Sequence, residues 1–120
     1  MKPFSRSDRV GGLIKQVMAE LLNKHIGDPR LSGATITDVK VSRDLRLAKI
    51  YFATSGGKDA SKEALEGFER ARGFVKRELA QRMTLRYMPD LKFYYDESFD
   101  YGARIEKLLK AVKKDHADDH

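Results

Sequence analysis

The sequence predicts an α+β domain in which a three-stranded sheet carries helices on one face. Three observations predict it: apolar residues at helical spacing near the N-terminus, three short segments of alternating polarity, and a long helical pattern between the second and third of these. The length of 120 residues, of which 41% are hydrophobic, suits one domain with a single thin core. We expect this domain to span residues 1–112, including a short last helix, and residues 113–120 to form a charged, frayed tail.

The first helix is predicted from a cap and an apolar stripe. Ser5 or Ser7 can cap its N-terminus. The stripe, at spacings of three and four residues, consists of Val10, Leu13, Ile14, Val17, Met18, Leu21 and Leu22. Gly11 and Gly12 lie inside this helix and each cost up to about 1 kcal/mol relative to alanine. Tertiary packing must therefore hold the first turns.

Alternating polarity predicts three strands. In the first, over residues 35–42, Ile36 lies on the face opposite the other apolar positions, so we expect a bulge or a covered edge there. Arg43-Asp44 forms a turn to the second strand, over residues 46–54, and the third strand covers residues 91–95. The inward side chains of the last two strands are Ala48, Ile50, Phe52, Leu91, Phe93 and Tyr95.

The long helix is predicted to contain a break. It runs from Ser61, which offers a partial cap, to about Arg86. Its apolar stripe includes Leu65, Phe68, Val75 and Leu79. Arg72 falls inside this stripe, and a break at Gly73 resolves the conflict because a bend lets the arginine swing out.

The charge balance points to a polyanionic partner. Twenty-four Lys and Arg against eighteen Asp and Glu give a net charge of +6, with a pI near 9.6. Such an excess attracts nucleic acid or an acidic membrane surface. The chain has no cysteine, which excludes disulfides, thiolate metal sites and a cysteine nucleophile. We find no targeting segment and no long apolar run, so we expect a cytoplasmic protein that does not enter a membrane.

No catalytic or metal-binding constellation is predicted. The densest group of possible metal ligands, His116 with residues 118–120, lies in the tail and is typical of a solvated chain end. Asp96, Glu97 and Asp100 cluster between a strand and a helix, where carboxylates usually act as caps. We therefore predict no enzymatic activity, no metal and no cofactor.

The signal for nucleic-acid binding is stronger. Between residues 69 and 86, six cations face two glutamates, which gives a local charge of +4. The cations are Arg70, Arg72, Lys76, Arg77, Arg82 and Arg86. Clustered Lys and Arg around a helix break can hold phosphates through their charge and through exposed backbone N–H groups.

A second candidate surface is the outer face of the sheet. Its outward residues are Lys40, Lys49, Tyr51, Lys92 and Tyr94. Basic residues interleaved with aromatic ones can stack single-stranded bases. The same residue types are also ordinary on exposed strands, because Tyr favours strands and Lys protects their edges. The sequence leaves both interpretations open.

Several motifs, in the same order along the chain, resemble bacterial ribosome-binding factor A. The matching segments are Asp28–Leu31, Thr35–Leu45, Ala71–Gly73, Arg86–Leu91, Asp96–Ser98 and Tyr101–Ile105. The order of helices and strands is that of a type II KH domain, and Ala71-Arg72-Gly73 is similar to the Ala-x-Gly kink of the family. The resemblance runs from about Ser5 to Val112, nearly the whole chain.

The resemblance implies a non-enzymatic assembly factor. It implies binding to the immature small ribosomal subunit, contact with its rRNA near the decoding region, and support of late maturation, rRNA processing and cold adaptation. Ordinary KH domains clamp four nucleotides with a Gly-x-x-Gly loop, which this chain lacks. Recognition of folded rRNA by shape and phosphates fits better.

Our predicted RNA contacts combine the basic cluster with one addition from the turn between the first two strands and one from the second strand. They are Arg70, Arg72, Lys76, Arg77, Arg82 and Arg86, with Arg43 and Lys49, while Ala71 and Gly73 set the bend. The predicted partner is the small ribosomal subunit with its rRNA, bound by a monomer. One alternative is a general single-stranded RNA-binding module that uses Tyr51 and Tyr94. Another is a small basic adaptor for an acidic protein partner.

Overall fold

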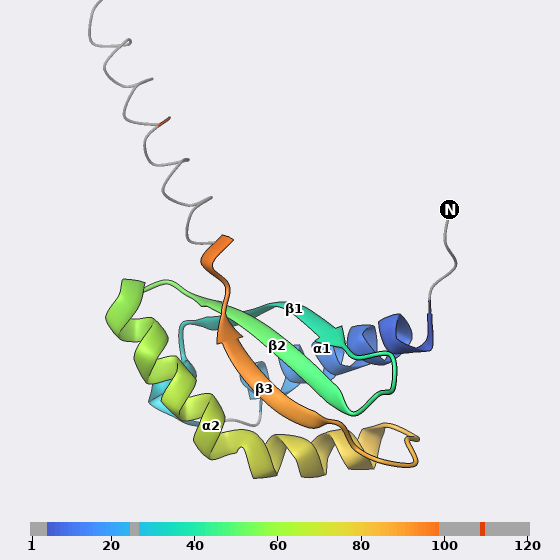
Figure 1. Ribbon diagram of the computed structural model, residues 1–120. Helices are drawn as coiled ribbons and strands as arrows, with labels where there is room; N and C mark the ends of the chain where they lie inside the picture. The colour runs from blue at the N-terminus through green and yellow to red at the C-terminus, as the bar shows by residue number, and fades with distance from the viewer. Residues whose placement is uncertain (1–4, 25–26, 99–108, 110–120) are drawn as a thin grey trace, which may run out of the picture.

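A computed structural model describes residues 5–24, 27–98 and 109. Within these residues the elements are α1 (Arg6–Lys24), the short 3-10 helix η1 (Pro29–Leu31), β1 (Ala34–Val41), β2 (Leu47–Thr54), α2 (Gly57–Arg82) and β3 (Asp90–Tyr95). Both α-helices pack on one face of the sheet, and Figure 1 looks onto the face that they leave open. The predicted α+β architecture is confirmed.

The strands lie in the order β1–β2–β3, so β2 is central and the other two form the edges. β1 and β2 are antiparallel, whereas β3 is parallel to β2. Parallel neighbours need a crossover connection, which α2 supplies. Ala48, Ile50 and Phe52 of β2 are fully buried beneath the helices, as predicted.

The predicted bulge in β1 is present. The pairing of β1 with β2 shifts between Ile36 and Asp38. Ile36 and Val39 are three residues apart, so regular alternation would place them on opposite faces. The extra residue of the bulge allows both to be buried. The Thr37 hydroxyl donates a hydrogen bond of 2.6 Å to Asp96, just beyond β3. The bulge thus places both apolar side chains in the core and keeps Asp38 outside.

α1 begins with a reciprocal cap. The Ser5 hydroxyl accepts a hydrogen bond from the Asp8 backbone N–H, and the Asp8 carboxylate accepts one from the Ser5 N–H, both at 3.2 Å. The buried members of the predicted stripe are Val10, Ile14, Val17, Met18 and Leu21. Leu13 is predicted to face inward but is 50% exposed. At about 100° per residue it lies at the margin of the buried arc.

Gly11 has a packing role that the sequence alone does not reveal. A Cβ at this position would lie 3.0 Å from the backbone oxygen of Val39 in β1. At Gly12 a Cβ would meet nothing within 4 Å. Gly11 therefore lets α1 approach the edge strand closely, and only Gly12 lowers helix propensity without a packing gain.

A local cap fixes the segment between α1 and β1. Asp28 Oδ1 accepts a hydrogen bond of 3.0 Å from the Arg30 N–H, and Pro29 occupies the first position of η1. Leu31 is buried against α2 at Gly67, where a Cβ would lie 3.1 Å from the leucine side chain. Gly67 therefore makes room for η1.

α2 begins and ends earlier than predicted. It starts at Gly57 rather than Ser61, and its N-cap, Gly56, makes no side-chain cap bond. Ser61 lies inside the helix, where its hydroxyl donates a hydrogen bond of 2.7 Å to a backbone carbonyl three residues earlier. The helix ends at Arg82 rather than near Arg86.

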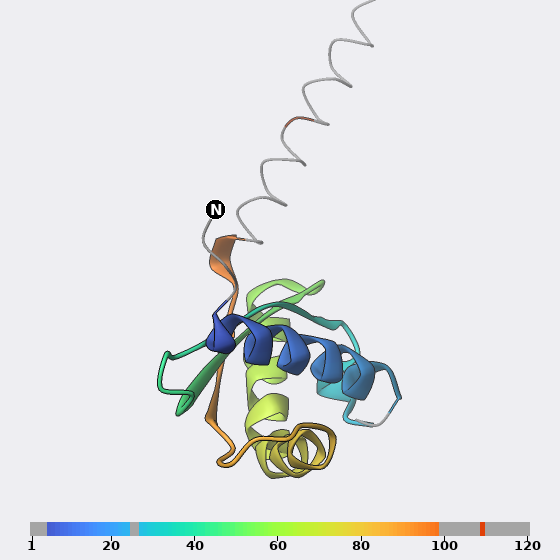
Figure 2. The ribbon, with the colours of Figure 1, turned by 90° about the vertical axis from the view of Figure 1, so that its right-hand side faces the viewer.

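α2 is bent, but the predicted break at Gly73 is absent because the helix continues through this residue. Its helical assignment is continuous over residues 57–82, yet Figures 1 and 2 show two arms that point in different directions. Leu65, predicted to face inward, is 36% exposed, because Ala64 occupies the core position instead. The buried residues of α2 are Ala64, Gly67, Phe68, Val75 and Leu79.

Phe68 joins α2 to the sheet. Its side chain is fully buried, with ring centroids 4.8 Å from Phe52 of β2 and 5.0 Å from Phe93 of β3. Aromatic pairs at these separations add to the stabilisation that burial provides. One residue of α2 thus packs on two neighbouring strands.

The sequence predicts a short last helix and a charged tail in residues 105–120. Apart from Leu109, residues 105–120 lie outside the described residues. In the described ranges, no helix combines the length and apolar character needed to cross a membrane.

Candidate nucleic-acid interface

α2 presents an open basic stripe. Arg70 and Arg77 are exposed and lie seven residues apart, a spacing of two helical turns. Gly73 lies between them and is exposed, with no atom within 4 Å of where its Cβ would stand. Neither arginine forms an ion pair with another described residue. Because glycine leaves the helix surface bare, a phosphate backbone can approach closely between two free guanidinium groups.

Arg72 does not swing out as predicted. Its guanidinium pairs with Glu69 on the preceding turn and lies 6.0 Å from the ring centroid of Phe93. Its Nε is buried and has no hydrogen-bond partner among the described residues. The side chain stays above the apolar stripe because an aromatic ring and a carboxylate accommodate its charge there.

Two further predicted contacts are held by carboxylates of the fold itself. Lys76 Nζ lies 3.2 Å from Asp90 Oδ1 at the start of β3. Arg82 Nη1 lies 2.6 Å from Glu20 Oε2, and this pair ties the end of α2 to α1. A phosphate must compete with these carboxylates, so the Arg70–Gly73–Arg77 stripe is the most accessible basic part of α2.

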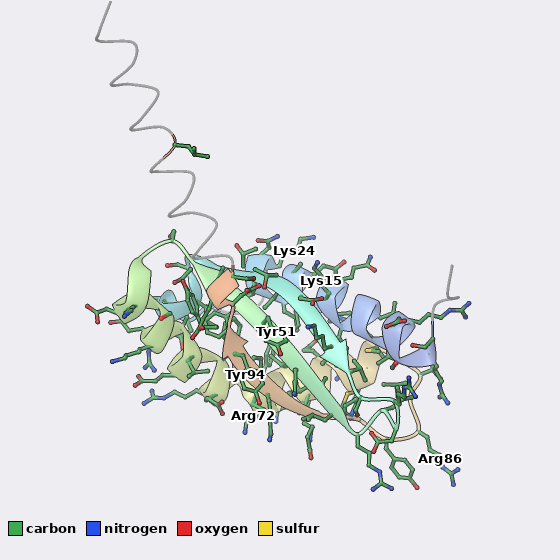
Figure 3. The ribbon with its side chains drawn as sticks, turned by 45° about the horizontal axis from the view of Figure 1, so that its top comes forward. Lys15, Lys24, Tyr51, Arg72, Arg86 and Tyr94 are labelled. Atoms are coloured by element: carbon green, nitrogen blue, oxygen red, sulfur yellow. The ribbon has the colours of Figure 1, made fainter. Side chains whose placement is uncertain are left out.

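Arg86 and Arg43 lie at the hairpin end of the sheet. The Arg86 guanidinium is 5.6 Å from the ring centroid of Tyr87, which is 75% exposed. Together with Arg46 from the turn between β1 and β2, Arg86 lines a pocket of about 570 Å³. Arg43 is exposed in the same turn. Figure 3 shows Arg86 well separated from Arg72, so the predicted contacts do not form one continuous cluster.

Asp44 fixes the turn that carries Arg43 and Arg46. Its Oδ1 accepts hydrogen bonds from the Ser42 hydroxyl, at 2.6 Å, and from the Arg46 N–H, at 3.1 Å. The Ser42 hydrogen bond, followed by that from Arg46, lowers the pKa of Asp44 below its usual value. The carboxylate is therefore charged at neutral pH and offsets part of the arginine charge around the pocket.

Lys49 lies on the open face of the sheet, opposite to the helices. It pairs directly with Lys40 of β1 on one side and with Lys92 of β3 on the other. Two residues further along, Tyr51 of β2 and Tyr94 of β3 stack with ring centroids 5.6 Å apart (Figure 3). Alternation in the sequence puts these side chains on one face, but the register that aligns the three lysines cannot be read from it.

Asp96, just beyond the end of β3, has a structural role. Asp96 Oδ1 accepts hydrogen bonds from the N–H and hydroxyl of Ser98, as expected for a cap. In the part of the chain that the structure describes, no group of three or more His, Cys, Asp or Glu side chains can hold a metal ion. Asp100 and the His116–His120 cluster lie outside that part.

Comparison with known proteins decides the family. The family model described as Ribosome-binding factor A matches residues 6–109. The chain belongs to the ribosome-binding factor A family. A member from Desulfatibacillum aliphaticivorans is 48% identical over 112 residues, which cover 93% of this chain and 91% of that protein. A member from Desulfosudis oleivorans is 47% identical over 118 residues, with coverage of 98% and 92%.

Solved structures of the family share the fold. The crystal structure of ribosome-binding factor A from Thermus thermophilus matches with a TM-score of 0.66 and 26% identity, over 74% of this chain and 93% of that one. A homology model of the Thermus protein, fitted into a cryo-EM map of its complex with the 30S subunit, matches with a TM-score of 0.60 and 25% identity. That match covers 72% of this chain and 91% of the other. The family predicted from the sequence motifs is confirmed.

Proposed function

We propose that this protein is a non-enzymatic assembly factor that binds the immature small ribosomal subunit, as a monomer in the cytoplasm. Family membership supports the ribosome as its target, because the related Thermus protein has been fitted into a map of a 30S complex. The observation that carries the rRNA contact is the exposed stripe of Arg70, Gly73 and Arg77 on α2. Through this contact the protein supports late maturation of the subunit, rRNA processing and growth in the cold.

Recognition by this surface depends on phosphates and shape rather than on bases. The two arginines of the stripe are free to bind phosphates bidentately, which guanidinium groups favour. Ala71 and Gly73 permit the bend of α2, so the helix follows a curved RNA backbone. Arg72, Lys76 and Arg82 are paired with carboxylates, so they contribute to RNA binding only where a phosphate displaces the carboxylate.

The hairpin end supplies a second contact with the same RNA. Arg86 lies there beside the exposed Tyr87 ring and lines the pocket, and Arg43 is exposed in the nearby turn. Guanidinium groups next to an aromatic ring suit an unpaired nucleotide at the margin of a folded element.

The protein acts on the subunit by differential affinity. A ligand shifts a conformational equilibrium only by as much as its affinities for the two conformations differ. Tighter binding to one immature rRNA conformation holds the subunit in that state. It thereby delays subunit joining until maturation is complete.

Cosedimentation with immature and mature small subunits across a salt series tests this proposal. The Arg70→Gln/Arg77→Gln variant is compared with Lys58→Gln/Lys62→Gln, which removes the same charge from exposed positions early in α2. We expect preference for immature particles, and in the arginine variant a salt slope reduced by roughly two. The lysine variant should retain most of the slope.

Three outcomes would count against the proposal. Equal binding to mature and immature particles would remove the role in assembly. An equal loss in both double variants would show that net charge, rather than the stripe, determines binding. Complexes that persist after ribonuclease treatment would favour the adaptor alternative.

A further inference from the structure

Three lysines form a row straight across the open face of the sheet. Lys40, Lys49 and Lys92 are direct cross-strand partners in the β1–β2 and β2–β3 pairings, and all three are exposed. Neighbouring strands lie about 4.8 Å apart, so the three ammonium groups start from closely spaced backbone positions. Within the described residues, none of them forms an ion pair.

The stability of the fold does not account for this row. Like charges directly opposite each other destabilise a sheet. Lysine on an edge strand discourages pairing with other chains, which explains Lys40 on β1 and Lys92 on β3. Lys49 lies on the central strand, where there is no edge to protect. A neutral residue at position 49 would relieve repulsion on both sides, so the lysine fits a negatively charged ligand better than it fits the sheet.

The tyrosines beside the row specify the kind of anion. Tyr51 and Tyr94 stack at an interplanar angle of 29°, and the Lys40 ammonium lies 5.6 Å from the Tyr51 ring centroid. Tyr94 is 39% exposed and lies on the side of the pair away from β1. Asp38 faces Tyr51 from β1 and disfavours phosphate on that side. Cations next to an exposed ring match a strand with phosphates and unpaired bases, whereas an acidic peptide would leave the ring unused.

We propose that the open face of the sheet binds a short unpaired RNA segment, with phosphates on Lys49 and Lys92 and a base stacked on Tyr94. This surface lies on the opposite side of the sheet from the α2 stripe. The protein can then hold two RNA segments at once, a folded one on α2 and a single strand on the sheet. Only the ribosomal origin of that strand rests on the proposed function, because binding to free RNA requires no ribosome.

Fluorescence anisotropy with a 5′-fluorescein-labelled ten-nucleotide oligouridylate tests the proposal. Tyr94→Ala and Lys49→Gln should each weaken binding about tenfold, since each removes a stacking or phosphate contact. Tyr94→Phe, which keeps the ring, should bind as the native protein does. Lys58→Gln, with the same charge change on exposed α2, is the matched control. Lys49→Gln should also raise the midpoint of thermal unfolding by about 1–3 °C, because it relieves repulsion.

The outcomes separate this proposal from the function proposed above. Oligouridylate binding that is unchanged in Tyr94→Ala, or that falls equally in Lys49→Gln and Lys58→Gln, would overturn it. A lower unfolding midpoint for Lys49→Gln would overturn it too, because the lysine would then serve the fold. Small-subunit binding that depends on Arg70 and Arg77 would stand in each of these cases. Loss of oligouridylate binding in the sheet variants, with that subunit binding retained in part, would support two independent surfaces.

Discussion

α2 and the open face of the sheet are both basic, but their cations differ in what they contact. On α2, Arg72 pairs with Glu69 and Arg82 with Glu20, and Lys76 pairs with an aspartate of β3. On the sheet, three aligned lysines face one another without a carboxylate partner among the described residues. Counting Lys and Arg residues along the sequence therefore gives α2 more free positive charge than it has, and gives the sheet face less.

The difference follows from how each surface is built. A long helix packed beside another helix and a strand edge meets carboxylates from both, and its cations become part of the fold. The lysines of the open sheet face form no ion pair with a described residue, so their charge stays available. Available charge, rather than total charge, determines where a polyanion binds.

The largest expected effect is a loss of stability that removes both basic surfaces together. Phe68→Ala removes the ring that packs between Phe52 and Phe93 and should lower the free energy of unfolding by about 3–5 kcal/mol. That is a large share of the stability of a small domain. Urea denaturation followed by circular dichroism measures it, with Phe68→Leu as the milder control. An unchanged urea midpoint would show that α2 does not depend on this contact.

A second prediction compares the side of α2 that packs on η1, at Gly67, with its exposed side, at Gly73. Gly67→Ala places a Cβ 3.1 Å from Leu31 and should cost about 1–3 kcal/mol of unfolding free energy. Gly73→Ala meets no atom within 4 Å and should stabilise the helix by about 0.5–1 kcal/mol. The added methyl group of Gly73→Ala should nevertheless weaken subunit binding, because it stands between Arg70 and Arg77. Equal stability changes in the two variants would contradict the packing described for η1.

A third prediction separates a paired cation from a free one. Arg82→Met breaks the ion pair with Glu20 and should lower the free energy of unfolding by about 0.2–1 kcal/mol. Arg77→Met should leave stability nearly unchanged and weaken subunit binding more than Arg82→Met does. Parallel urea denaturation and cosedimentation measure both quantities. If Arg82→Met weakened binding more, the ion pair would have to open on the ribosome.

The smallest effect concerns the turn at the hairpin end. Titration of Asp44 by carbon-13 NMR should give a pKa below 3.8, and Ser42→Ala should raise that pKa because it removes the main cause of the shift. Because the folded pKa is lower than the unfolded one, the ionised carboxylate stabilises the fold at pH above the unfolded value. That contribution is lost as the pH falls through the folded pKa. An unchanged Asp44 pKa in Ser42→Ala would show that another contact lowers it.

Features that depend on neighbours in sequence were predictable. The Ser5 cap follows from a serine just before the first helical residues. The bulge near Ile36 and the inward sides of β2 and β3 follow from side-chain periodicity over a few residues. The family also follows from sequence, because its motifs are short and keep their order.

Features that join distant segments were not predictable in this way. The partner of Arg82 lies 62 residues earlier in the chain, so no local pattern indicates it. The accommodation of Arg72 depends on a ring in β3, and the lysine row depends on the register of a parallel strand that follows a long crossover. The start of α2 was misplaced because Gly56 provides no side-chain cap.

The bulge in β1 gives that strand one spare residue. Without Thr37, plain alternation would still turn Ile36 and Val39 toward the helices and leave Lys40 beside Lys49. Removing one residue from β2, whose pairing with β3 has no shift, would instead turn every following side chain to the opposite face. Among related chains, a change in length of one residue is therefore tolerable at Thr37 and damaging in β2.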